Sequence, residues 1–138
     1  MHLTRPDDNS IQFQYKCSSG GSLDTLVLKN TDYNDDGNGN AVYLDRHNID
    51  CGKDSLISGL KLVRDGKGNY QYQYQCAPSK TPLTCRQLST PSNDDGGGNS
   101  VYLDRHDINC NTDESISQLK LVRNGDHAYQ YNYTCCKN

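Results

Sequence analysis

Apolar and polar residues alternate in several short stretches of the chain. In residues 70–76, tyrosines and Cys76 occupy every second position, and glutamines occupy the positions between them. Successive side chains of a β-strand point to opposite faces, so we expect the tyrosines and the cysteine to face the core. No stretch keeps a helical period over three turns. The pattern therefore predicts an all-β protein.

Two hairpins are expected, each joining a Leu-Lys-Leu-Val-Arg strand to a tyrosine-rich strand. Their strands are residues 60–64 and 70–76 in the first hairpin, and residues 119–123 and 129–135 in the second. The second turn contains Asn124-Gly125, a dipeptide typical of tight β-hairpin turns. Further strands are expected at residues 42–45, 26–28 and 85–88.

The two hairpins belong to a longer tandem repeat. Residues 34–76 align with residues 93–135 without a gap, and 28 of the 43 positions are identical. We call the offset between the copies, from residue 34 to residue 93, the repeat period. Two copies are too few for a solenoid, so the repeat predicts two similar small antiparallel β lobes held together by disulfides. We expect an N-terminal tail and strand at residues 1–17, a first repeat at 18–76 and a second at 77–138.

A third, partial copy of the tyrosine-rich strand lies at residues 11–17. Its Ile11, Phe13, Tyr15 and Cys17 share one face, and it matches residues 70–76 in spacing. This surplus strand has no place in two equal lobes, so we expect it to pair away from their regular bodies. Another chain's sheet edge and the seam between the lobes are the two candidate partners.

Seven cysteines indicate a disulfide framework, since small domains with thin cores and many cysteines are typical of oxidising compartments. Cys85 and Cys136 are both absent from the first repeat, where Leu26 and Ala77 stand, as expected for a bonded pair. The simplest assignment leaves Cys17 odd and pairs Cys51–Cys76, Cys110–Cys135 and Cys85–Cys136. A competing assignment pairs Cys17–Cys51 and Cys76–Cys110 and leaves Cys135 odd, and spacing does not decide between the two.

Charge and hydropathy limit the classes of partner. The formal net charge is −3, without a basic stripe, so nucleic acid is not an expected partner. No apolar run reaches membrane-spanning length, so membrane insertion is not expected either. The cysteines indicate a secreted, extracellular protein. Residues 1–8 lack the hydrophobic segment of a signal peptide, so we expect the leader to be absent from this sequence.

Two Asp-x-His pairs are the candidate catalytic groups: Asp45 with His47, and Asp104 with His106. On a strand, residues two apart share a face, so each carboxylate could orient the imidazole beside it. No serine or unclaimed cysteine recurs nearby as a nucleophile. We therefore expect these residues to support a loop, and we expect no enzyme. One recurring histidine per repeat also argues against a metal site.

Two Asn/Asp/Gly-rich loops precede these pairs and contain Asp35 and Asp36, and Asp94 and Asp95. Carboxylates in such loops can bind calcium, together with the nearby Asp-x-His residues. The spacing does not match an EF-hand, and the same residues dominate ordinary turns. Ordinary loops without a cofactor are therefore expected, and calcium remains the alternative.

These features favour a structural role, in which the protein is a self-associating protomer of a fibre, coat or matrix that uses β-strand pairing between subunits. The alternative is a secreted bivalent lectin-like or adhesion module that binds glycans through aromatic and Asp/Asn clusters. The only glycosylation sequon begins at Asn132, on the expected outward face of its strand.

Overall fold

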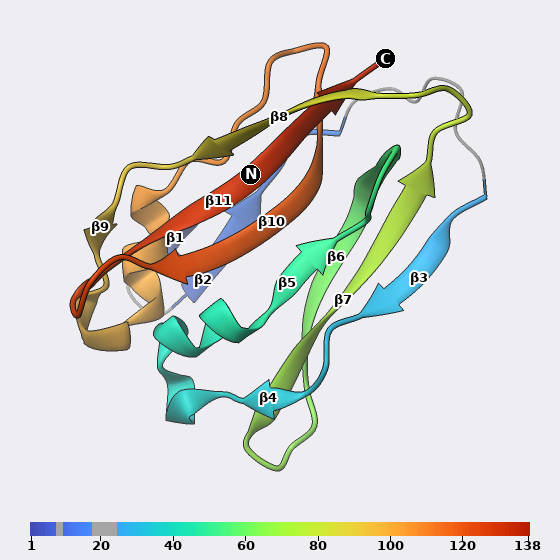
Figure 1. The fold of residues 1–138 in the computed structure, drawn as a ribbon. Helices are drawn as coiled ribbons and strands as arrows, with labels where there is room; N and C mark the ends of the chain where they lie inside the picture. The colour runs from blue at the N-terminus through green and yellow to red at the C-terminus, as the bar shows by residue number, and fades with distance from the viewer. Residues whose placement is uncertain (8–9, 18–24) are drawn as a thin grey trace.

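The computed structural model describes residues 1–7, 10–17 and 25–138, and within them the protein is all-β. Three antiparallel sheets and four short 3₁₀ helices make up the fold (Figure 1). No helix in the described part of the chain is long and apolar enough to cross a membrane. The alternating sequence pattern thus predicts the fold class correctly.

The first sheet is built around the hairpin of β6 and β7. Its strands are β3 (Val27–Asn30), β4 (Asn34–Asp35), β6 (Ser55–Arg64) and β7 (Asn69–Pro78). β3 and β4 follow each other along one edge of β7, and β6 pairs with β7 on the other. The expected strands at residues 26–28, 60–64 and 70–76 all lie within or overlap this sheet.

The second sheet is built in the same way around β10 and β11. Its strands are β5 (Asn48–Asp50), β8 (Thr84–Ser89), β9 (Asn93–Asp94), β10 (Ser115–Arg123) and β11 (Ala128–Lys137). β5 precedes β6 in the chain, yet it pairs with β10, as Figure 1 shows. The two halves are therefore joined by a strand that the first contributes to the second. The division into residues 18–76 and 77–138 remains a prediction.

The structure contradicts the expected strand at residues 42–45, which lie in a 3₁₀ helix. The helices are η1 (Gly37–Gly39), η2 (Ala41–Arg46), η3 (Gly96–Gly98) and η4 (Ser100–Arg105). The Asn40 side chain caps η2 by accepting the Val42 N–H at 3.0 Å. A 3₁₀ helix has three residues per turn, so Ala41, Leu44 and His47 lie on one side, and all are buried.

The surplus strand pairs with the residues just before it in its own chain. β2 (Ser10–Gln14) forms a hairpin with β1 (His2–Asp7), and we call this pair the N-terminal hairpin. β1 joins it to the second half of the chain, because Met1 O accepts the Ile108 N–H at 2.9 Å and His2 pairs with Asp107. The second edge of β2 has no strand partner among the described residues, and pairing of this strand with another chain stays a prediction.

The tyrosine rows form the core, as the alternation predicts. The buried aromatic side chains are Tyr70, Tyr72, Tyr74, Tyr129, Tyr131 and Tyr133. Leu119 and Leu121 of β10 pack in the same cluster. Among the outward positions, Gln71 is the exception, because it is buried as well.

Three disulfides hold the described residues together: Cys51–Cys76, Cys110–Cys135 and Cys85–Cys136. They correspond to the first of the two assignments, and Cys17 is free and exposed. Cys85–Cys136 joins β8 to β11 and has no counterpart in the first half, where Leu26 and Ala77 stand. Loops closed by such bridges are typically stabilised by about 3–4 kcal/mol.

Candidate functional site

Three hairpins of the protein share one strand register. Leu3 lies opposite Phe13 in the N-terminal hairpin. Leu62 lies opposite Tyr72 in the β6–β7 hairpin, and Leu121 lies opposite Tyr131 in the β10–β11 hairpin. Each leucine is one repeat period from the next along the chain. The three leucines therefore hold equivalent positions, and their surroundings can be compared directly.

Two of the three hairpins are covered by a segment from another part of the chain. β5 pairs with β10, with Ile49 opposite Leu119 and Asn48 opposite Lys120. η2, which precedes β5, packs on β10. The N-terminal hairpin is covered in the same way, because residues 107 and 108 bond to Met1 and His2 while η4 packs on β1.

Within the described ranges 1–7, 10–17 and 25–138, the third hairpin has no such segment of helix and strand on it, although β6 packs against β10 and Ser117 of β10 donates to Ser55 O at its start. β6 pairs with β7 on one side, and no described strand pairs with its second edge. We call residues 59–62 on this side the β6 edge. Leu62 is 39% exposed, whereas Leu3 and Leu121 are each 2% exposed. An uncovered strand edge with an apolar residue is a docking site for another strand.

Equivalent residues of the three hairpins line one small cavity. Its volume is about 10 Å³, and its lining includes Met1, Leu60 and Leu119, and also Phe13, Tyr72 and Tyr131. Within each set of three, neighbours are one repeat period apart. A cavity of this size holds about one water molecule, so the place where the hairpins meet is packed and offers no space for a larger ligand.

The two histidines of the Asp-x-His pairs are buried in this core. His47 Nδ1 lies 2.8 Å from Thr31 Oγ1, which also accepts the Tyr72 N–H. His106 and Thr90 repeat the contact at 2.9 Å. Both imidazoles meet tyrosine rings edge-on, with centroids 5.3–5.7 Å apart. Their Nε2 atoms are buried without a hydrogen-bond partner.

Burial decides the ionisation of these groups. Desolvation lowers the pKa of His47 and of His106, so both are neutral in the folded protein near pH 7. Burial raises the pKa of Tyr70 to about 12, and nearby Asp36 adds to the shift. Nδ1 is paired with a threonine hydroxyl, and Asp45 lies 3.4 Å from Arg123. This arrangement suits a structural histidine rather than a general base.

The aspartates of the predicted calcium loops bond to their own backbone. Asp35 and Asp36 accept the N–H groups of Gly37 and Asn38, at 2.7 and 2.8 Å. Asp94 and Asp95 make the same turns in the second half. In the described part of the chain, no cluster of three or more His, Cys, Asp or Glu side chains is placed to hold a metal ion.

A stack on each 3₁₀ helix explains the glycine and the arginine of these motifs. The Arg46 guanidinium lies 4.3 Å from the centroid of the Tyr43 ring. Gly37 lies against the same ring with a φ of +61°, and a Cβ atom there would overlap it. Arg105, Tyr102 and Gly96 repeat the arrangement. These contacts hold the loop against the helix, and they give a structural reason for the recurrence of these residues.

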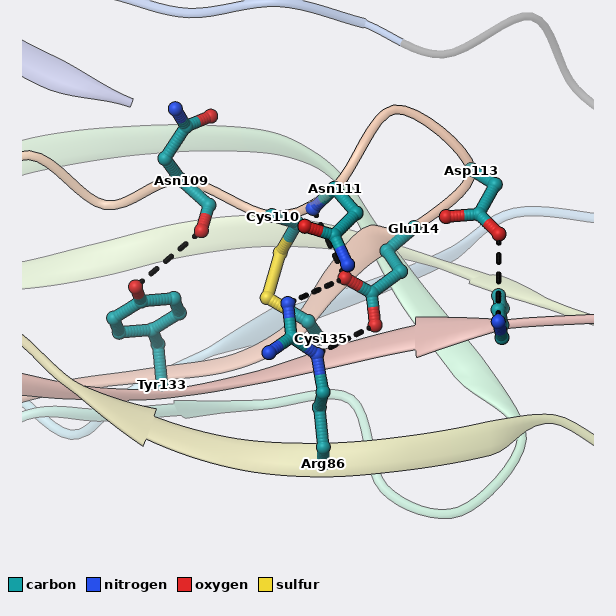
Figure 2. Close-up of polar contacts among 9 residues, drawn as sticks. Arg86, Asn109, Cys110, Asn111, Asp113, Glu114, Tyr133 and Cys135 are labelled. Carbon is teal, nitrogen blue, oxygen red and sulfur yellow. Dashed lines mark hydrogen bonds and ion pairs between the residues drawn. A yellow bond between two sulfur atoms is a disulfide. The ribbon is translucent and has the colours of Figure 1, made fainter.

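A buried carboxylate distinguishes the second half from the first. Glu114 accepts two hydrogen bonds from Arg86, at 2.7 and 2.8 Å, and one from the Asn111 N–H, as Figure 2 shows. The Arg86 guanidinium, with the Asn111 amide, lowers the pKa of Glu114 to about 2. The corresponding residues of the first half are Val27 and Ser55. The ion pair fastens the 110–114 loop over β8.

A shallow polar groove of about 380 Å³ crosses the outer face of β8, β10 and β11. Asn132 lies in it and accepts a hydrogen bond from Ser89 at 2.7 Å. Its side chain is exposed, as expected from its position between buried tyrosines. Thr134 of the same sequon donates to Gln118 at 3.3 Å. The groove is an outward polar hollow with groups that could contact a sugar.

Comparison with protein-family models, curated proteins and solved structures finds no match to the chain.

The β6 edge was missed by the sequence analysis, although a signal for it was present. The third copy continues upstream of residue 11, because Leu3 and Arg5 align with Leu62 and Arg64 at the same spacing. Three hairpins and only two covering segments would have predicted that one hairpin lacks a covering segment. The threonine partners of the histidines carried a weaker signal, because Thr90 lies one repeat period after Thr31 but nothing in the sequence places either threonine beside a histidine.

Proposed function

We propose that the protein is an extracellular structural protein whose chains associate by β-strand pairing, as protomers of a fibre, coat or matrix. We interpret its two halves as tandem copies of one unit. The N-terminal hairpin is then part of a third copy. The pairing surface is the β6 edge. This role requires neither catalysis nor a cofactor.

The contrast between Leu62 and its two equivalents carries the proposal. The same leucine is fully covered in two hairpins and exposed in the third. Covering a leucine side chain typically contributes about 1.5–3 kcal/mol, and pairing a strand edge adds backbone hydrogen bonds. Association of a second chain at this edge would provide both.

Other features support an extracellular, self-associating protein. The three disulfides are typical of proteins that work in oxidising surroundings. Apolar side chains near the N-terminus are exposed as well, including Phe13 in β2 and Tyr15 just after it. Exposed apolar surface of this kind is a common feature of interaction sites.

Sedimentation velocity over a range of protein concentrations tests the proposal. The wild-type chain should form larger species as its concentration rises, and Leu62→Asp should remain monomeric. Leu28→Asp is the matched control, because Leu28 is more exposed but lies on β3, across β7 from β6. A wild-type chain that stays monomeric, or a Leu62→Asp variant that associates normally, would contradict the proposal.

A glycan-binding role is the second candidate, and the outer groove favours it. The groove presents amide and hydroxyl groups of Gln87, Ser89 and Asn132, which are groups that sugars use as hydrogen-bond partners. A glycan array with the wild-type chain and with Ser89→Ala tests this role. Selective binding that Ser89→Ala weakens would support it, and no binding would exclude it.

A further inference from the structure

We infer that the β6 edge receives residues 107–109 of a second copy of this chain, with η4 of that copy covering Leu62. In the isolated chain, the N-terminal hairpin occupies this segment and must be displaced. The inference rests on the proposed function and identifies the partner at the same site.

The contact between β5 and β10 provides the pattern for this interface. Asp50, Ile49 and Asn48 pair in turn with Gln118, Leu119 and Lys120. η2 leads into β5, and Asp45 of η2 lies 3.4 Å from Arg123 at the end of β10. A donor segment in this protein is thus a 3₁₀ helix followed by a short strand with one inward isoleucine.

The chain contains a second donor segment of the same kind. η4 leads into residues 107–109, and Ile108 is buried like Ile49. This donor holds the N-terminal hairpin, with His2 opposite Asp107. The register repeats the first contact, because Asp107 lies one repeat period after Asn48 and Lys120 lies two periods after His2. The same interface is therefore formed twice within one chain.

Among the described residues, there are fewer donor segments than hairpins that could accept one. Two donor segments face three hairpins, and the β6–β7 hairpin is the one left without a donor. Residues 60–64 are identical to residues 119–123, which already accept a donor. β1 shares only Leu3 and Arg5 with that sequence. The β6–β7 hairpin thus matches the donor's requirements more closely than the N-terminal hairpin does.

The charges of the two segments favour docking of η4 at the β6 edge. Arg64 is exposed at the end of β6, in the position of Arg123. A docked η4 would bring Asp104 to it, as η2 brings Asp45 to Arg123. The donor and the acceptor lie in different halves of the chain, so the contact is heterologous. Repeated contacts of this type build filaments or closed rings, which fits a fibre or coat.

Cysteine pairs in the full-length chain test the inference, in a Cys17→Ser background. Cross-strand partners lie at a distance that a disulfide can span. Lys61→Cys with Asp107→Cys should give covalent oligomers on oxidation, because residues 61 and 107 meet only between chains. His2→Cys with Asp107→Cys should close within one chain and raise the concentration needed for association at least about tenfold.

The possible results of these experiments distinguish a failure of the inference from a failure of the proposed function. Lys61→Cys alone should give few covalent dimers. Efficient dimer formation by this single variant would mean that two β6 edges pair with each other, and it would overturn the inference. Normal association of the chain locked by the 2–107 disulfide would overturn it as well and leave the proposed function standing. A chain that shows no association before any cysteine is introduced would contradict both.

Discussion

Leu62 and Leu121 occupy the same place in two hairpins of one register, yet only Leu121 is covered by a neighbouring segment. The cover of Leu121 comes from η2 and β5, which belong to the first half of the chain. The difference between the two leucines therefore reflects what lies beside each hairpin rather than the hairpins themselves. Among the described strands, it leaves β6 with an unpaired edge beside an exposed leucine, and a further strand could pair there.

This difference predicts unequal costs of truncation. Leu121→Ala should lower the free energy of unfolding by about 2–5 kcal/mol, because it leaves a cavity in the core. Leu62→Ala should change it by no more than about 0.5–1 kcal/mol in dilute solution. Urea denaturation at low protein concentration measures both. Equal losses at the two positions would mean that Leu62 is covered in the monomer.

The buried histidines predict acid sensitivity. Because burial lowers the pKa of His47 and His106, protons bind more tightly to the unfolded chain, whose histidines titrate near 6.5. The free energy of unfolding is therefore not reduced by these histidines above pH 6.5, and it falls as the pH drops below 6.5. The double variant His47→Asn/His106→Asn should be less stable at pH 7 but lose this slope between pH 7 and 5. His127→Asn, at an exposed turn, is the control and should keep the slope.

The Arg86–Glu114 pair predicts a second, more acidic transition. The folded pKa of Glu114 is about 2, below its ordinary 4.5, so the pair stabilises the protein fully above pH 4.5 and is lost as the pH falls toward 2. Glu114→Gln should be less stable than wild type at pH 7, and the gap should narrow in that window. Asp113→Asn, whose exposed carboxylate lies 3.4 Å from Lys137, is the control. A gap independent of pH would contradict the assignment.

Removal of the Cys85–Cys136 bridge by alanine substitution at both positions should lower the free energy of unfolding by about 4 kcal/mol, because a long loop is no longer closed. Cys17→Ser should change it by less than about 0.5 kcal/mol, since Cys17 is exposed and unbonded. Denaturation followed by circular dichroism measures both. Similar losses in the two variants would argue against this bridge.

The fold class, the tyrosine faces and the hairpins could be predicted because each depends on residues close together in sequence. Residues 42–45 show where this reasoning failed. Val42 and Leu44 alternate like a strand, but Ala41, Leu44 and His47 also recur every three residues, and the Asn40 cap selects the 3₁₀ helix. Two periods therefore compete in this segment, and the Asn40 side chain favours the helical one.

The candidate site was harder to predict, because it depends on contacts between distant segments. β5 has only three residues, and nothing within them indicates that β10 rather than β6 is their partner. Likewise, the sequence placed the histidines beside aspartates, whereas the fold pairs them with Thr31 and Thr90, each 16 residues upstream. Only the shared repeat period pointed toward a third hairpin, and through it to the uncovered edge.

Hydrogen exchange along β6 tests the central claim most directly. In dilute solution, the outward amides of residues 59–62 should exchange much faster than those of residues 118–121, which β5 covers. At concentrations where the chain associates, the same amides of residues 59–62 should become protected, while residues 118–121 stay unchanged. Slow exchange at residues 59–62 in the monomer, or association that leaves their exchange unchanged, would contradict the assignment of the β6 edge as the surface that joins the chains.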